Sequence, residues 1–246
     1  MNRAPYIEGD ILLNKITRFL RKHKTTLSEH RRRFSDYFEM LVFNLVVDFY
    51  QQQGFEVNVQ NLTGGTFFYK LSPKGNPQKF SWFSVEKKYQ TITESFEIHH
   101  NLAVETTLAG PLFVTPDVVV INSNSITHIP DKRYYKTAYF YVPNKYLQTF
   151  FEVKNLTPFP ELLFNYIGLF YSLRSDLFDG KPPKTRNPRH LAPSLVLSGP
   201  GNYHTNLIRS TLSDKFSVNI FFNLFCNPDK LTSKKHILDI HKIGTR

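Results

Sequence analysis

The pattern of hydrophobic residues changes at Gly54, and this change constrains the fold more than any other feature of the sequence. Before it, large apolar residues recur at helical spacing, at Phe34, Tyr37, Phe38, Leu41, Val42, Leu45, Val46 and Phe49. Spacings of three and four residues put these side chains on one side of an α-helix. Gly54 fits the left-handed position at which many helices end. After it, apolar residues alternate or run together, which is typical of β-strands.

Strand patterns dominate the middle of the chain. We expect a β-hairpin over 55–69, because Thr63-Gly64-Gly65 separates two short strand-like runs. Further strands are expected over 81–92, 96–105, 116–121, 148–154, 194–197 and 218–222, and a strand-rich insertion over 122–144. Helical spacing occurs over 10–23 and returns after Pro160, which suits the first turn of a helix. The order of helix, strands, helix and strand predicts a mixed α/β domain.

The composition excludes several classes of protein. The single cysteine, Cys226, rules out an internal disulfide and a zinc site built on cysteine pairs. The longest nearly apolar run, residues 40–47, falls short of the roughly 20 residues that a membrane-spanning helix needs. No apolar signal region follows the N-terminus. We therefore expect a soluble, cytoplasmic protein with no membrane partner.

Positive charge is concentrated at the two ends of the chain, which has a formal net charge of +11. Residues 1–33 carry nine Lys and Arg against three Asp and Glu, and residues 181–246 carry eleven against three. Residues 34–180 carry eleven against fourteen. Basic ends around a slightly acidic centre favour a protein that binds a polyanion and uses its central carboxylates for another purpose. The alternative is that the basic ends are solvated tails.

Two of the strands expected to be buried each carry a carboxylate. Asp117 stands directly before the apolar run 118–121, and Glu152 lies within 148–154. An unpaired buried charge costs several kcal/mol, so such carboxylates need compensation or a function. Lys154 lies two residues beyond Glu152, and side chains two apart leave the same face of a strand. Two acids and an amine on adjacent strands can bind a divalent cation and orient a water molecule.

Pro116-Asp117 followed by Glu152-Val153-Lys154 resembles the signature of the PD-(D/E)XK nuclease superfamily, to which many restriction endonucleases belong. The order of elements over residues 34–200 agrees with it. The resemblance implies a restriction-endonuclease-like mixed β-sheet flanked by helices, with an α-β-β-β-α-β core and an inserted β-hairpin region. It divides the chain into a basic, helical N-terminal segment, residues 1–33, and a nuclease-like domain, residues 34–246.

The signature is short, and other parts of the chain match pieces of it. Pro-Asp also occurs at Pro130-Asp131 and at Pro228-Asp229, and Glu86-Lys87-Lys88 is a second acid-x-Lys sequence. Glu86 precedes every Pro-Asp pair and Asp229 follows both acid-x-Lys sequences, so neither preserves the order of the signature. Asp131 is followed by a basic stretch typical of a loop, whereas Asp117 is followed by an apolar strand. We therefore assign the signature to Asp117.

The resemblance implies a ligand set and a role for the lysine. Mg²⁺, or Mn²⁺ as a substitute, would be held by Asp117, Glu152 and the backbone carbonyl group of Val153, because Mg²⁺ prefers hard oxygen ligands. Lys154 would position the attacking water molecule and stabilise the transition state. The alternative is that Asp117 caps a strand end and that Glu152 and Lys154 form a structural ion pair.

A third acid is common in this superfamily, and it lies on the first core helix. Glu39 is the candidate, because it sits at the border of the apolar side of that helix. Asp36, three residues earlier on the same side, is the rival. An ordinary solvated acid is the alternative for either residue.

The implied function is that of a Mg²⁺-dependent endonuclease that cuts DNA, of the restriction or genome-defence type. Two alternatives remain open: a structure-specific repair or recombination nuclease, and a non-catalytic nucleic-acid-binding module on the same fold. In the basic loop 181–190 we expect Lys184, Arg186 and Arg189 to contact DNA phosphates. A homodimer or larger complex also fits, because double-strand cleavage usually requires two active sites. Recognition sequence, preference for DNA over RNA, and need for an activator stay open.

Overall fold

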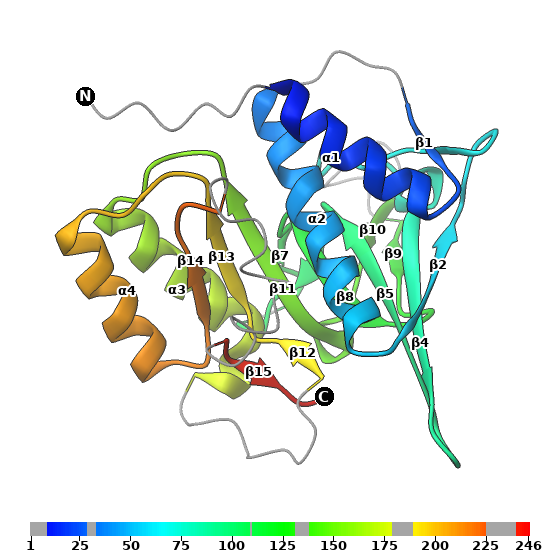
Figure 1. Cartoon of the computed structure of the whole chain (residues 1–246). Helices are drawn as coiled ribbons and strands as arrows, with labels where there is room; N and C mark the ends of the chain where they lie inside the picture. Colours follow the sequence, from blue (N-terminus) through cyan, green and yellow to red (C-terminus); the bar gives the residue numbers. More distant parts are fainter. Residues whose placement is uncertain (1–8, 29–32, 109, 131–137, 179–188, 225–239) are drawn as a thin grey trace.

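The computed structural model of the protein has a seven-stranded mixed β-sheet at its centre (Figure 1). The structure describes residues 9–28, 33–108, 110–130, 138–178, 189–224 and 240–246. Across the sheet, the strands are β14 (Asn219–Phe221), β13 (Ser194–Leu197), β11 (Leu147–Lys154), β8 (Val118–Asn122), β5 (Thr93–His100), β4 (Trp82–Lys88) and β2 (Glu56–Gln60). The α-helices are α1 (Gly9–Lys22), α2 (Phe34–Gln52), α3 (Pro160–Arg174) and α4 (Tyr203–Lys215), and the short 3-10 helices are η1 (Pro77–Lys79), η2 (Asn144–Tyr146) and η3 (Ser175–Leu177). The mixed α/β class expected from the sequence is confirmed.

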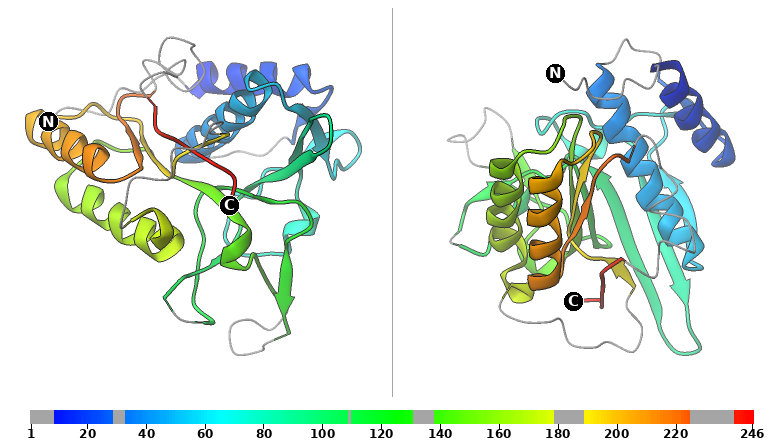
Figure 2. Two further views of the ribbon diagram at one scale, coloured as in Figure 1. Left: turned by 90° about the horizontal axis from the view of Figure 1, so that it is seen from below. Right: turned by 60° about the vertical axis from the view of Figure 1, so that its left-hand side comes forward.

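The sheet changes from antiparallel to parallel pairing at β11. Strands β2, β4, β5, β8 and β11 pair with their neighbours in antiparallel fashion, whereas β13 and β14 run parallel to β11. Parallel neighbours need a crossover connection, which is usually a helix. Accordingly, α3 joins β11 to β13, and α4 joins β13 to β14. Figure 2 shows α3 and α4 packed side by side on one face of the sheet.

Helices α1 and α2 cover the opposite face of the sheet. Successive side chains of a strand point to opposite faces, so β8 contributes to two cores. Val118 and Val120 pack in the core that contains α1 and α2, whereas Val119 and Ile121 pack in the core that contains α3. Helix α1, which lies in the described part of the basic N-terminal segment, therefore packs in the same hydrophobic core as α2.

Helix α2 and its end agree with the sequence prediction. Its apolar side is buried along nearly its whole length. Gly54 follows with a φ of +82°, a left-handed conformation that glycine adopts without a steric penalty. The backbone N–H of Gly54 donates to the carbonyl of Gln51, and that of Phe55 donates to the carbonyl of Tyr50 over 3.1 Å. These bonds satisfy carbonyl groups that the last turn would otherwise leave free.

The prediction of a β-hairpin over 55–69 is wrong. β2 pairs along its full length with β4 instead. The second half of the expected hairpin contributes only β3 (Thr66–Phe67), which pairs in parallel with β1 (Thr26–Leu27). An isolated bridge between Thr63 and Thr66 closes the turn. The physical reason is that a strand of two residues offers β2 few hydrogen bonds, whereas β4 offers a partner for every residue.

The insertion expected between residues 122 and 144 contains strands in its described part. β9 (Thr127–Ile129) and β10 (Tyr139–Tyr141) form an antiparallel pair outside the main sheet. Two further short pairs are β6 (Val104–Glu105) with β7 (Phe113–Val114), and β12 (His190–Leu191) with β15 (Lys242–Ile243). Along the described residues, no helix has the length and apolar character needed to cross a bilayer.

The close approach of the chain segments after β11 and β13 yields a test of the fold. A Cβ atom at Gly199 would lie 2.7 Å from Cα of Thr157 and 3.0 Å from the carbonyl oxygen of Leu156. Neither backbone atom can move without displacing the segment that follows β11. We expect Gly199→Ala to lower the free energy of unfolding by about 1–3 kcal/mol, measured by urea denaturation.

Gly168 provides the matched control. It lies inside α3, and a Cβ atom there would meet no heavy atom of the described residues within 4 Å. Gly168→Ala should raise the free energy of unfolding by about 0.5–1 kcal/mol, because alanine loses less conformational entropy in a helix. Equal stability of the two variants would contradict the close packing at Gly199.

Candidate active site

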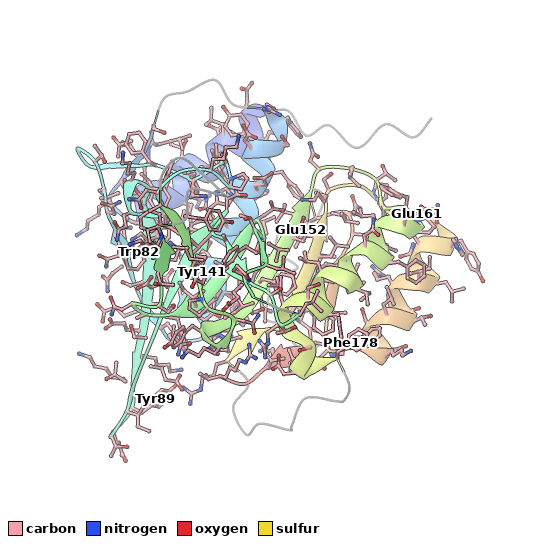
Figure 3. All side chains as sticks on the ribbon, turned by 180° about the vertical axis from the view of Figure 1, so that it is seen from behind. Trp82, Tyr89, Tyr141, Glu152, Glu161 and Phe178 are labelled. Carbon is pink, nitrogen blue, oxygen red and sulfur yellow. The ribbon has the colours of Figure 1, made fainter. Side chains whose placement is uncertain are left out.

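Asp117 and Glu152 lie opposite each other on two neighbouring strands. Asp117 is the residue before β8, and Glu152 lies near the end of β11. The antiparallel register pairs Phe151 with Val118, so one further step places Glu152 opposite Asp117. Directly opposed side chains in an antiparallel pair leave the same face of the sheet. Figure 3 labels Glu152 at the end of the sheet where α3 begins, with Glu161 in the first turn of that helix.

The ammonium group of Lys154 contacts both carboxylates. Its Nζ lies 2.6 Å from Oε1 of Glu152 and 3.2 Å from Oδ2 of Asp117. The same oxygen of Asp117 accepts a hydrogen bond of 2.6 Å from the backbone N–H of Val153. The structure therefore brings together the three residues of the sequence signature. Their catalytic role stays a prediction.

Helix α2 brings Glu39 to the same site. Its Oε2 lies 3.6 Å from Nε2 of His100, the last residue of β5, and it is close enough to Asp117 for the charge of Asp117 to raise its pKa. Asp36 instead accepts a hydrogen bond of 3.0 Å from the backbone N–H of Arg33, at the start of α2. Of the two acids that the sequence left open, the structure places Glu39 at the site and Asp36 in the helix cap.

Burial and mutual repulsion oppose full ionisation of the three carboxyl groups. Burial, and after it the charge of Asp117, raises the pKa of Glu152 to about 7. The same two causes raise the pKa of Glu39 to about 7. Burial also raises the pKa of Asp117, against the opposing effects of Lys154 and of the hydrogen bond from Val153. Both effects are expected wherever carboxylates share a partly buried site.

Lys154 keeps its positive charge in this environment. Burial lowers the pKa of its ammonium group, but the charges of Asp117 and Glu152 raise it, and the net shift is upward. A protonated lysine donates hydrogen bonds and carries charge, but it has no lone pair with which to accept a proton. The site thus combines a fixed cation with three carboxyl groups.

The donor atoms of the site suit a hard divalent cation. Carboxylate and carbonyl oxygens are the ligands that Mg²⁺ prefers, and Mg²⁺ usually keeps several water molecules. A cation held by Asp117 and Glu152 would offset the repulsion that raises their pKa values. Among the residues that the structure describes, no group of three or more His, Cys, Asp or Glu side chains is arranged to hold a metal ion. The predicted ligand set therefore relies on two carboxylates, the carbonyl group of Val153 and water.

Besides His100, two further neighbours of the site were not predicted from the sequence. Asn101, directly after β5, donates its backbone N–H to the carbonyl of Asp117 over 2.9 Å, and a hydrogen bond from its side chain lowers the pKa of Glu39. Tyr166 of α3 is buried, and burial followed by the charge of Glu152 raises the pKa of its hydroxyl group. Within the described part of the chain, that hydroxyl group has no hydrogen-bond partner.

The sequence signals for these two neighbours are weak. Asn101 has a φ of +50°, and asparagine is among the few residues that adopt this conformation readily. Nothing in the sequence marks the end of β5 at that point, because the alternating pattern continues beyond it. Tyr166 fits the apolar side of α3 and is therefore indistinguishable from a core residue.

The structure bears on one of the three basic residues predicted to contact DNA. Lys184 and Arg186 lie outside the described residues. Arg189 forms an ion pair with Glu94 and donates a hydrogen bond to the hydroxyl group of Tyr89, and its guanidinium group lies 4.4 Å from the centre of the Tyr89 ring. Because Glu94 and Tyr89 already engage Nη1, a contact between Arg189 and DNA would use the other N–H donors of its guanidinium group.

Comparisons of the chain with protein-family models, with curated proteins and with solved structures give no match. A function proposed for the chain therefore rests on its fold and on the geometry of the site.

The raised carboxyl pKa values predict how the stability of the metal-free protein depends on pH. A carboxyl group whose pKa is higher in the folded state stabilises the fold while it is protonated. This contribution is lost as the pH rises from 4.5 through about 7. We expect Asp117→Asn to reduce the loss of unfolding free energy between about pH 5 and about pH 8. The amide oxygen can still accept the hydrogen bond from Val153, but it no longer raises the pKa of Glu39 and Glu152.

Chemical denaturation in the presence of a chelator, repeated over a series of pH values, measures this difference. Asp214→Asn is the matched control, because Asp214 is exposed on α4 and should leave the pH dependence of wild type unchanged. An identical pH dependence in wild type and Asp117→Asn would contradict the repulsion between the carboxyl groups.

Proposed function

We propose that the protein is a Mg²⁺-dependent endonuclease that hydrolyses phosphodiester bonds in DNA. The observation that carries this proposal is the convergence of Asp117, Glu152, Lys154 and Glu39 at one end of the sheet. They come from three separate elements, and they are the residues to which the PD-(D/E)XK resemblance assigns catalysis.

The topology around the site supports the proposal. Among the α-helices and the strands of the seven-stranded sheet, α2 is followed by β2 and β4 and then by β5, β8, β11, α3 and β13. Without β2 and β4, this order is α-β-β-β-α-β. Strands β5, β8 and β11 are antiparallel neighbours, and β13 pairs in parallel with β11 after α3 crosses over. We therefore propose a restriction-endonuclease-like core extended at both edges of its sheet.

Each residue is proposed to have a role that suits its surroundings. Asp117, Glu152 and the carbonyl group of Val153 would hold the cation, which when bound polarises the scissile phosphate and acidifies a water molecule. Lys154 is protonated, so it would donate hydrogen bonds to the water and to a phosphate oxygen and would stabilise developing negative charge. Glu39, with a pKa of about 7, is suited to accept the proton that the water loses.

The charge of the whole chain favours a polyanionic partner. With a net charge of +11, the protein attracts nucleic acid over long range and raises its local concentration. The carboxyl groups of the site repel phosphates at short range. A bound divalent cation would offset this repulsion, so the proposal requires metal for cleavage but not for all DNA binding.

Cleavage of supercoiled plasmid DNA tests the proposal. We expect wild type to cut in Mg²⁺ or Mn²⁺ and to be inactive in a chelator. Asp117→Ala and Lys154→Ala should each lower the rate by about 100-fold or more, because each removes a charged group from the place where charge develops. DNA binding, measured by a gel-shift assay, should be largely retained.

Two variants on β4 serve as matched controls. Glu86→Gln and Lys88→Ala alter the second acid-x-Lys sequence, which lies outside the site, and both should cut at the wild-type rate. Full activity of both Asp117→Ala and Lys154→Ala would refute the assignment. DNA binding without any cleavage by wild type would favour the non-catalytic module, and cleavage of branched DNA alone would favour the repair or recombination nuclease.

A further inference from the structure

Lys70 is a buried lysine outside the candidate active site. It follows β3 and is only 3% exposed. Burial lowers the pKa of its ammonium group to about 8, and the charge of no described carboxyl group offsets this effect. Burying a cation without a counter-ion is unfavourable, and an apolar side chain would avoid this cost. The contacts of Lys70 therefore point to a role beyond packing.

The ammonium group of Lys70 donates hydrogen bonds to three backbone carbonyl groups. The acceptors are Ser72 at 2.6 Å, Pro73 at 3.0 Å and Asn101. A protonated lysine has three N–H donors, so these bonds use its full donor capacity. The bond to Asn101 joins the segment after β3 to the residue that directly follows β5.

Asn101 connects Lys70 with two residues of the candidate active site. Its Nδ2 donates to the carbonyl of Lys70 over 3.0 Å, and a hydrogen bond from the same side chain lowers the pKa of Glu39. An amide nitrogen carries two hydrogens, so one amide group can serve both acceptors. The backbone N–H of Asn101 donates to the carbonyl of Asp117 over 2.9 Å. Asn101 thus links Lys70 to an acid of α2 and to the start of β8.

The two peptide groups of Asn101 are fixed by these bonds. The bond to Asp117 holds its N–H, and the bond from Lys70 holds its carbonyl. Its φ of +50° lies in the left-handed region, which is unfavourable for most residues other than glycine. The side chain is 6% exposed, so it has little freedom to move into solvent. The amide group is therefore held in one place beside Glu39.

We propose that Asn101, held in place by Lys70, is a positioning residue for the carboxyl group of Glu39. This role rests on the proposed function, in which Glu39 accepts the proton that the attacking water loses. A donor fixed on one oxygen of Glu39 restricts rotation of the carboxyl group and leaves the other oxygen for the water. Asn101 acts through Glu39 and touches neither the phosphate nor the cation.

Asn101→Gly removes the amide group alone, because glycine adopts the left-handed conformation without strain and keeps both backbone bonds. In Mg²⁺-dependent cleavage of supercoiled plasmid, we expect kcat to fall by about ten-fold or more and KM to change by about two-fold or less. A misplaced catalytic group slows the chemical step, whereas substrate binding is untouched. The pH at which kcat is half-maximal should rise, because the hydrogen bond that lowers the pKa of Glu39 is lost.

Cation binding without DNA provides a measurement that does not depend on activity. Calorimetric titration of Asn101→Gly with Mn²⁺ should give an affinity within about two-fold of wild type, because the proposed ligands are unchanged.

Asn61→Gly is the matched control. Asn61 also has a left-handed backbone, with a φ of +56°, and its Nδ2 also donates to two acceptors, the carbonyl groups of Gln78 and Phe80. Asn61 lies outside the site, so its loss should leave kcat, KM and the pH dependence at the wild-type values even where stability falls.

Lys70→Met tests whether Lys70 acts through Asn101. We expect it to lower kcat in the wild-type chain and to lower it by a smaller factor in the Asn101→Gly background, because residues that act together are not additive. Equal factors in both backgrounds would contradict the link between the two residues. Asn101→Gly alone decides the matter if Lys70→Met does not fold.

The same experiment separates this role from the proposed function. Wild type that does not cut would refute the proposed function, and the role of Asn101 with it. Wild type that cuts, with an unchanged kcat or an unchanged pH dependence in Asn101→Gly, would overturn the role of Asn101 alone. A loss of Mn²⁺ affinity in Asn101→Gly, or an equal loss of activity in Asn61→Gly, would also overturn it, because either result indicates general damage to the fold.

Discussion

The ion cluster of Lys154 with Asp117 and Glu152 is the interaction on which the rest of the site depends. Buried carboxylates are tolerated only when their charge is compensated, and here a single ammonium group contacts both. The compensation is incomplete, because the pKa values of Glu152 and Glu39 stay raised to about 7. A site with only a structural role would be more stable with fewer carboxyl groups. The proposed divalent cation would supply the positive charge that these carboxyl groups lack.

Helix α2 connects the candidate active site with the hydrophobic core that it shares with α1. Glu39 lies at the site, and Asn44, five residues later, is buried in the core. Tyr69 lies between them: its hydroxyl group donates to Asn44, and its ring packs edge-on against that of His100, 6.0 Å between centres. His100 in turn contacts Glu39. A continuous series of contacts thus runs from Glu39 through His100 and Tyr69 to Asn44.

Local patterns in the sequence predicted elements but not their partners. The spacing of apolar residues placed α2 and its end at Gly54 correctly, because helix formation depends on neighbours within a few positions. The predicted partner of β2 was wrong, since strand pairing depends on residues far along the chain. Asp36 and Glu39 could not be separated from sequence, because only the folded helix shows that Asp36 caps its start. Asn101 and Tyr166 gave little signal, because their neighbours at the site come from other elements.

The position of the site follows from the change of strand direction at β11. Because β11 is antiparallel to β8 and parallel to β13, the ends of β11 and β13 meet the start of β8 and the end of β5 at one end of the sheet. Open sheets bind ligands at the carboxyl ends of such strands, where the chain leaves the sheet and backbone groups become available. One of these backbone groups, the N–H of Val153, donates a hydrogen bond to the carboxylate of Asp117. Farther along β8, both faces of the strand are covered, and residues 118–121 are all valine or isoleucine. Strand β8 therefore carries no charged residue in its middle, and Asp117 stands at its start, where the chain enters the sheet.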